Sequence, residues 1–102
     1  MNIFENIPST IKEEVFETLA SSSTCKIERI VSNGHCSAED FFYDQESNEW
    51  VIVLKGEAII GFEEADEVHL KAGDYLNIPL HVKHQVKWTL PQSETICLAI
   101  HY

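Results

Sequence analysis

The spacing of hydrophobic and polar positions along the chain changes near Cys25. Before it, in residues Pro8 to Ser23, apolar side chains recur at helical spacing and form a single stripe. Thr10 and Glu13 have the spacing of a capping box, in which each side chain satisfies a free backbone donor of the first turn. This pattern predicts one short amphipathic helix in an N-terminal segment, residues 1–24. The stripe consists of Ile11, Val15, Phe16 and Leu19.

After Cys25 the pattern is one of short β segments with frequent turn signals. Asn33-Gly34 is a strong turn signal because both residues tolerate positive φ. Many short strands of this kind predict an all-β fold, an antiparallel barrel or sandwich over residues 25–102. The expected strands are Cys25–Ser32, Asp40–Tyr43, Glu49–Leu54, Glu57–Phe62, Glu67–Leu70, Tyr75–Ile78, His84–Thr89 and Thr95–Tyr102.

The central segment, Trp50 to Leu54, is apolar at every position, so neither face of this strand is polar. One face fills the interior, and the other must be covered by a second sheet, by the N-terminal helix or by another subunit. A homodimer is the preferred interpretation, and coverage by the helix alone is the alternative.

Composition narrows the classes of partner. The chain has 102 residues with 44% apolar content, which suits one domain with one core. Its 17 acidic against 7 basic residues give a net charge of −10, which disfavours nucleic acid and anionic membrane surfaces. We expect no signal peptide and no membrane span. The three cysteines show neither a disulfide framework nor a zinc knuckle, so a reducing cytoplasm is expected.

Two spaced motifs lie in the β region. In the first, Glu49 is followed after six residues by Gly56; in the second, Gly73 precedes Pro79 by five residues, and His84 follows. They resemble the second half of the first motif and most of the second motif of the cupin superfamily. The resemblance covers Gly34 to Trp88 and implies a small single-domain cupin. Such a protein is a jelly-roll β-barrel that commonly dimerises.

The departures from the family pattern concern its metal ligands. Metal-binding cupins use two histidines and the glutamate of the first motif and the histidine of the second. Glu49 and His84 match the last two, but both first-motif histidines are absent. Depending on the register, their places are taken by Phe42 and Asp44 or by Tyr43 and Gln45. In the second motif, His81 replaces a glycine and Trp88 an asparagine.

The remaining residues still offer a metal-ligand hypothesis. Asp44, Glu49, His84 and His81 supply carboxylates and imidazoles, a mixed set suited to a divalent Zn, Mn, Fe or Ni ion. His81 and His84 differ in parity, so a regular strand would send them to opposite faces. In the alternative reading, Glu49 is an interior carboxylate bonded to Tyr43 or Gln45, and His84 is a satisfied core histidine.

Two functions therefore stay open. One is a metal-dependent oxygenase, isomerase or lyase in which Glu49 or Tyr43 handles a proton. The other is a metal-free module without catalysis that holds a small molecule in a pocket beside His84. The expected pocket residues are Phe42, Tyr43, Gln45 and Trp88; His101 is expected at the surface.

Overall fold

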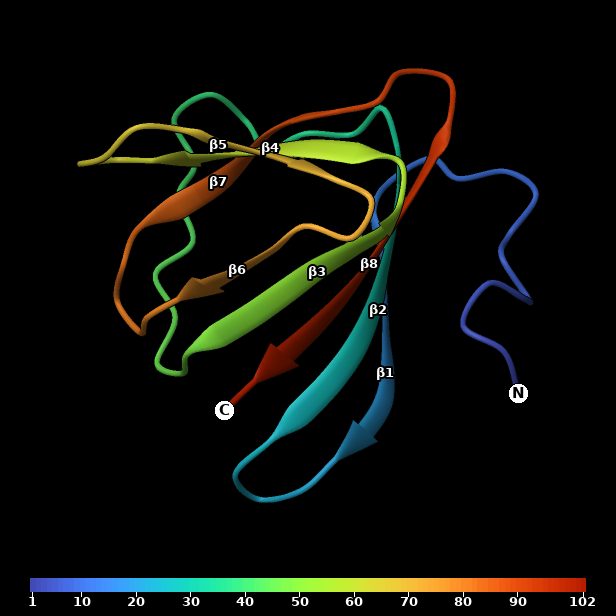
Figure 1. The fold of residues 1–102 in the computed structure, drawn as a ribbon, viewed down its shortest axis with the longest axis horizontal. Coiled ribbons are helices and arrows are strands. Elements are labelled where there is room, and N and C mark those ends of the chain that lie inside the picture. The colour runs from blue at the N-terminus through green and yellow to red at the C-terminus, as the bar shows by residue number, and fades with distance from the viewer.

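The computed structural model describes residues 1–102 and contains eight β-strands and no helix (Figure 1). No segment is therefore a helix of the length and apolarity needed to cross a membrane. The strands are β1 (Val15–Ser21), β2 (Lys26–Asn33), β3 (Glu49–Lys55), β4 (Glu57–Phe62), β5 (Val68–Lys71), β6 (Tyr75–Ile78), β7 (His84–Thr89) and β8 (Glu94–His101).

The strands form two antiparallel sheets. The larger has the order β1-β2-β8-β3-β6, and the smaller has the order β5-β4-β7. The two sheets are not joined by strand pairing, so the expected closed barrel is not formed. Alternate side chains of β3 and β4 are buried, as the two-residue period of a strand requires. The core between the sheets contains Val51, Val53, Ile60, Leu70, Ile78 and Ala99.

The strand predictions agree closely with the structure. β4, β6 and β7 have the predicted bounds, β3 ends one residue later, and β2, β5 and β8 are each shifted by one residue at both ends. The expected strand Asp40–Tyr43 is reduced to an isolated bridge between Tyr43 and His84.

The predicted N-terminal helix is wrong. Val15 to Ser21 forms β1, which pairs antiparallel with β2 along its length. The apolar stripe fits a strand as well, because Phe16 and Thr18 share one face while Val15 and Glu17 share the other. A strand here satisfies the free backbone edge of β2, and this tertiary pairing overrides the local helical pattern.

The segment before β1 is anchored by Arg29 of β2. The guanidinium donates hydrogen bonds to the backbone carbonyls of Ile3 (3.1 Å), Glu5 (2.6 Å) and Asn6 (3.2 Å). It also pairs with the Glu17 carboxylate at 2.6 Å and is only 3% exposed. Arg29 therefore fixes the N-terminal segment against the outer face of the larger sheet.

Gly56 joins β3 to β4, at the point where the chain passes from one sheet to the other. Its φ is +88°, and a Cβ there would lie 2.4 Å from the Thr95 hydroxyl and 2.8 Å from the Glu94 carbonyl. Gly73 also has a positive φ, +93°, but its Cβ would meet nothing within 4 Å. The two glycines therefore share the backbone requirement and differ in steric surroundings.

We predict that Gly56→Ala lowers the free energy of unfolding by about 2–5 kcal/mol, because left-handed strain adds to overpacking. Gly73→Ala, the matched control, should lose only about 1–2 kcal/mol from the backbone term. Urea denaturation of both variants measures the difference. Equal losses would show that the close approach to Thr95 is unimportant.

Candidate functional site

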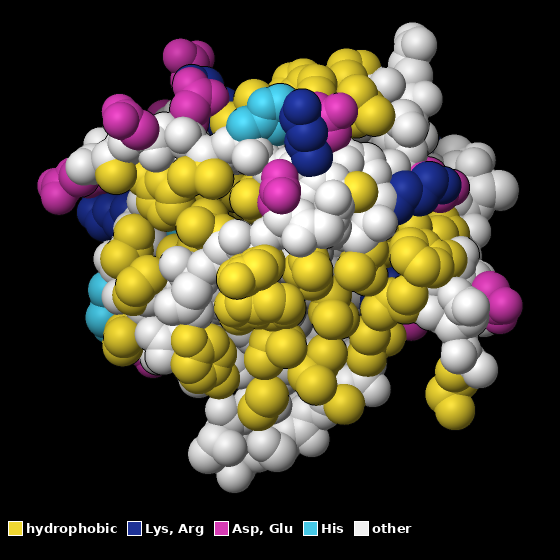
Figure 2. Space-filling model, viewed as in Figure 1, with side chains coloured by type: hydrophobic (Ala, Val, Ile, Leu, Met, Phe, Trp, Pro, Cys, Tyr) yellow, Lys and Arg dark blue, Asp and Glu magenta, His cyan; other side chains and the backbone are white.

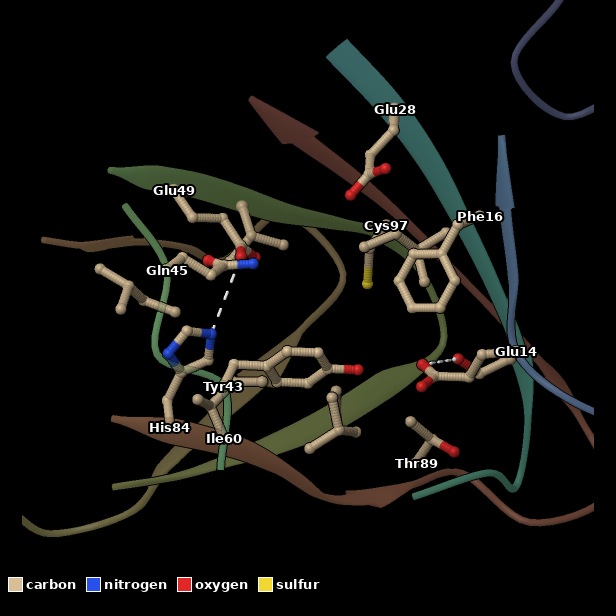
Figure 3. A pocket seen from close by; sticks show the side chains of 16 residues that line it. Glu14, Phe16, Glu28, Tyr43, Gln45, Glu49, Ile60, His84, Thr89 and Cys97 are labelled. Carbon is tan, nitrogen blue, oxygen red and sulfur yellow. Dashed lines mark hydrogen bonds and ion pairs between the residues drawn. The ribbon is translucent and has the colours of Figure 1, made fainter. Parts of the chain in front are cut away.

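A cavity of about 70 Å³ lies between the two sheets (Figure 3). Its wall combines apolar side chains from both sheets with polar groups gathered at two places. Of its 16 lining residues, nine are hydrophobic. The cavity is thus an apolar interior with a few placed polar groups, the usual composition of a small-molecule site.

Four polar side chains meet at one end of this cavity: Tyr43, Gln45, Glu49 and His84. Glu49 opens β3 and His84 opens β7, so strands of both sheets contribute. Tyr43 and Gln45 lie in the irregular segment before β3. The Tyr43 amide donates to the His84 carbonyl at 2.7 Å, and the His84 amide donates to the Tyr43 carbonyl at 3.2 Å. These bonds bring the four residues together, and we name them the polar cluster.

The Glu49 and His84 side chains face each other inside the polar cluster. The Nε2 of His84 lies 3.7 Å from Oε1 of Glu49, which is an ion-pair distance and too long for a hydrogen bond. The ring is oriented by its Nδ1, which lies 2.9 Å from the Val82 carbonyl, and by the Tyr43 ring, stacked at 5.6 Å. Because His84 is 4% exposed and Glu49 9% exposed, both polar groups are buried, with room between them.

This environment changes the acidity of two members of the cluster. Burial by itself lowers the pKa of His84, but Glu49 and the Val82 carbonyl favour the charged ring and raise this pKa above its ordinary value. Burial raises the pKa of the Tyr43 phenol, and the carboxylates around the cavity raise it further. Tyr43 therefore stays protonated at neutral pH and acts as a hydrogen-bond donor.

The second group of polar residues lies farther into the cavity. Glu14 accepts a hydrogen bond from the Ser32 hydroxyl at 2.9 Å, and burial raises the pKa of its carboxyl. Glu28 lies 2.7 Å from Nε2 of His101, which is therefore partly buried, not at the surface as expected. Burial, with nearby carboxylates, raises the pKa of the Cys97 thiol to about 12, so it is not a nucleophile at neutral pH.

Sequence reasoning missed Glu14, Glu28 and Cys97 as cavity residues. Glu14 was assigned to the helix that does not form. Glu28 had an available signal, because it alternates with Ile30 and Ser32 on one face of β2, and all three line the cavity. All three cysteines are free.

The structure separates the residues predicted for the site. Of the two pairs considered for the first-motif positions, Tyr43 and Gln45 line the cavity, and Phe42 and Asp44 do not. Asp44 points away and lies 2.8 Å from Nδ1 of His81, with the two side chains 46% and 59% exposed. Phe42 lies outside this cavity, and Trp88 packs edge-on against His69 on β5. The structure therefore brings neither Phe42 nor Trp88 into the cavity.

The residues present do not fit a transition-metal site. The four expected ligands form two separate pairs, Glu49 with His84 and Asp44 with His81. No group of three or more His, Cys, Asp or Glu side chains converges well enough to hold an ion. At the two first-motif positions, Tyr43 is a protonated phenol and Gln45 a neutral amide, both weak ligands for these metals.

His81 explains one departure from the second motif. Its φ is +61°, the left-handed conformation that glycine adopts freely and few other residues tolerate. The backbone shape of the motif is therefore kept although the glycine is lost. Its imidazole points to the surface, consistent with the opposite parity of His81 and His84.

The cupin domain model matches residues 30–101, and the chain therefore belongs to the cupin family. This range includes the polar cluster and all strands except β1 and the first half of β2. No curated protein matches the chain.

Solved structures agree with this assignment. A Ralstonia eutropha JMP134 protein, provisionally named a mannose-6-phosphate isomerase, is 38% identical with a TM-score of 0.95, over 99% of this chain and 94% of that one. A cupin superfamily protein from Desulfitobacterium hafniense DCB-2 is 21% identical, with a TM-score of 0.74 over 93% and 82% of the chains. An RmlC-like cupin with a double-stranded β-helix fold, from Methanocaldococcus jannaschii, is 20% identical, with a TM-score of 0.73 over 93% and 84%.

We predict that NMR titration places the pKa of His84 above about 6.5, the ordinary histidine value, and that Glu49→Gln lowers it. Because the folded pKa is raised, the stabilisation from the charged ring is complete below about pH 6.5 and is lost as pH rises through the raised value. The stability of the wild type relative to His84→Asn should fall across that window. A His84 pKa below the ordinary value would contradict the ion pair.

Proposed function

We propose that this cupin binds a small polar molecule in its interior cavity without using a metal ion. The observation that carries the proposal is the polar cluster, whose side chains face the cavity and lack hydrogen-bond partners for their inward atoms. Glu49 and His84 are both more than nine-tenths buried and stand 3.7 Å apart. These polar atoms face the cavity, and a polar molecule bound there would supply the hydrogen-bond partners that the protein does not.

The size of the cavity limits the ligand. A cavity of about 150 Å³ is enough for benzene, so 70 Å³ accommodates roughly four non-hydrogen atoms. The chemistry of the wall limits it further: Glu49 accepts hydrogen bonds, the Tyr43 phenol donates them and the Gln45 amide does both. The ligand is accordingly a molecule of two to three carbons that carries both donors and acceptors.

The charges around the cavity argue against a sugar phosphate. Its lining contains Glu14, Glu28 and Glu49 and neither lysine nor arginine. A phosphate dianion placed there would meet three carboxylates with His84 as the only basic side chain. We therefore do not transfer the substrate in the name of the Ralstonia eutropha protein to this chain.

Acid–base catalysis is the second candidate function. Glu49 and His84 present a carboxylate and an imidazole, whose pKa is raised, to the same small space, and Tyr43 adds a protonated phenol. Such an arrangement suits proton removal next to a carbonyl and its return at the neighbouring carbon, as in an isomerase. Glu49 would be the base, with His84 or Tyr43 as the acid.

We predict that glycolaldehyde and acetamide, two neutral molecules of roughly four non-hydrogen atoms, shift the amide resonances of the polar cluster in ¹H–¹⁵N NMR spectra. Dissociation constants in the millimolar range are expected, because ligands this small make few contacts. Glu49→Gln and His84→Asn should weaken binding about tenfold, because each removes a partner from the buried pair. Incubation of glycolaldehyde in D₂O, followed by ¹H NMR, measures proton exchange in the same samples.

Glu46→Gln and His81→Asn are the matched controls, since both residues are exposed and lie outside the cavity. If the hydroxymethyl protons exchange in the wild type and Glu49→Gln abolishes this exchange, the isomerase is favoured. Binding without exchange would favour the non-catalytic module. Equal weakening by the controls, or no shift at the cluster, would refute the proposed site. Zinc or nickel that binds near-stoichiometrically and depends on Glu49 and His84 would refute its metal-free character.

We also propose that a second copy of the chain covers the outer face of the larger sheet. The helix considered as an alternative cover does not exist, and Trp50, Ile52, Leu98 and Ile100 are left half-exposed. Tyr75, 65% exposed, extends this surface and packs against Trp50. Figure 2 shows hydrophobic side chains gathered over this side of the molecule. A second copy is the favoured occupant because two chains of net charge −10 associate best through an uncharged surface.

Sedimentation equilibrium should give twice the 11.6 kDa mass of one chain, and Ile52→Glu should give a single chain. The reason is that a charge in the centre of an apolar interface is left without a partner. Ile59→Glu, on the outward face of the smaller sheet, is the control and should stay dimeric. A wild type that sediments as one chain at all concentrations would exclude the dimer.

A further inference from the structure

The carboxylates of the cavity differ in how their charge is balanced. Glu49 faces His84 at 3.7 Å. Glu28 lies 2.7 Å from the His101 ring and 3.5 Å from the Lys26 ammonium. Glu14 forms no ion pair, and its one side-chain hydrogen bond comes from the neutral Ser32 hydroxyl at 2.9 Å. One of the three carboxylates around the cavity is thus left without a cation.

Glu14 belongs to the cavity although it precedes the first strand. Figure 3 shows the Tyr43 hydroxyl directed toward the Glu14 carboxylate. Burial raises the pKa of Glu14, and this effect outweighs the lowering by the Ser32 hydrogen bond and by the charge of His35. A carboxylate that is both partly desolvated and unpaired is costly, and a cation that enters the cavity would lower this cost.

Glu14 is also held in position. The Arg29 guanidinium fixes the backbone carbonyls of Ile3, Glu5 and Asn6, and β1 continues directly after Glu14 into pairing with β2. The segment is thereby attached on both sides of Glu14. Its carboxylate is a fixed part of the wall and not a mobile surface group.

We propose that the cavity selects small cations over neutral molecules and anions of the same size, and that Glu14 is the residue that sets this preference. This inference rests on the proposed binding function and specifies its ligand class. The ligand would place its cationic nitrogen at Glu14 and its other polar atoms at Glu49 and His84. Those two buried residues are the independent sign of a binding site, because the Glu49 carboxylate and the Nε2 atom of His84 form no hydrogen bond and stand 3.7 Å apart at the cavity.

An amidinium or a primary ammonium fits this description. An amidinium presents two parallel N–H donors, the geometry that a carboxylate accepts as a pair. Either group in a molecule of one or two carbons in total stays within roughly four non-hydrogen atoms, the size that the cavity admits.

Acetamidinium, acetamide and acetate test the proposal, because they have the same number of heavy atoms and nearly the same shape but differ in charge. We expect acetamidinium to shift cavity resonances in ¹H–¹⁵N NMR spectra with a dissociation constant at least tenfold lower than that of acetamide. Acetate should bind more weakly still. Glu14→Gln, which keeps the side-chain shape, should remove most of the preference for acetamidinium and leave acetamide binding within about twofold. Glu13→Gln, a neighbouring exposed carboxylate, is the matched control and should change neither.

The outcomes separate this inference from the function on which it rests. The role of Glu14 is overturned if the wild type binds acetamide as tightly as acetamidinium, or if Glu14→Gln keeps the preference for acetamidinium. Either result leaves the proposed polar site unaffected. Failure of all three probes to shift cavity resonances at about 50 mM overturns both. Thermal unfolding of Glu14→Gln should match that of the wild type within a few degrees. If the variant is less stable, the ratio of the dissociation constants of acetamide and acetamidinium still tests the role of Glu14. Loss of folded protein would weaken the binding of both probes equally.

Discussion

The reciprocal backbone hydrogen bonds between Tyr43 and His84 are the interaction on which the site depends. They join an irregular segment before β3 to the first residue of β7. They therefore fix Tyr43 and Gln45, which lie on that segment, relative to His84. A further bond, from the His81 amide to the Gln45 carbonyl at 2.8 Å, extends the connection by two residues. The segment is also held near its two ends, where Ser37 bonds to Val86 and Asn48 bonds to Tyr102. The bonds to His84 and His81 therefore fix the part in between, which places Tyr43 and Gln45 over the cavity.

This connection also explains how a cupin without the first-motif histidines keeps an ordered interior. The positions of the missing ligands are filled by Tyr43 and Gln45, and the stacked Tyr43 and His84 rings replace ligand bonds with packing at 5.6 Å. The Glu49 carboxylate then has as its partner an imidazole whose pKa is raised. The result is a site whose polarity comes entirely from side chains of the chain itself.

The sequence predicted most of the fold, because the strands after Cys25 carry clear alternation and turn signals. Val51 and Val53, for example, are buried as their period of two requires. The N-terminal helix failed because Val15, Phe16 and Leu19 satisfy both a helical and a strand pattern, and only pairing with β2 decides between them. At the site, Glu49 and His84 followed from motif spacing. Glu14 and Glu28 did not, because their place at the cavity depends on contacts between segments far apart in the sequence.

The order of strands in the larger sheet has a consequence for biosynthesis. β2 pairs with β1, its neighbour in sequence, and with β8, the last strand of the chain (Figure 1). β3 likewise pairs with β8 along one edge. On the ribosome, β2 and β3 are therefore made long before their common partner, and each waits with an unpaired edge. Contacts of such long range slow folding and leave apolar strands accessible to other chains. The net charge of −10 opposes association of such intermediates through their charged faces and so limits this risk.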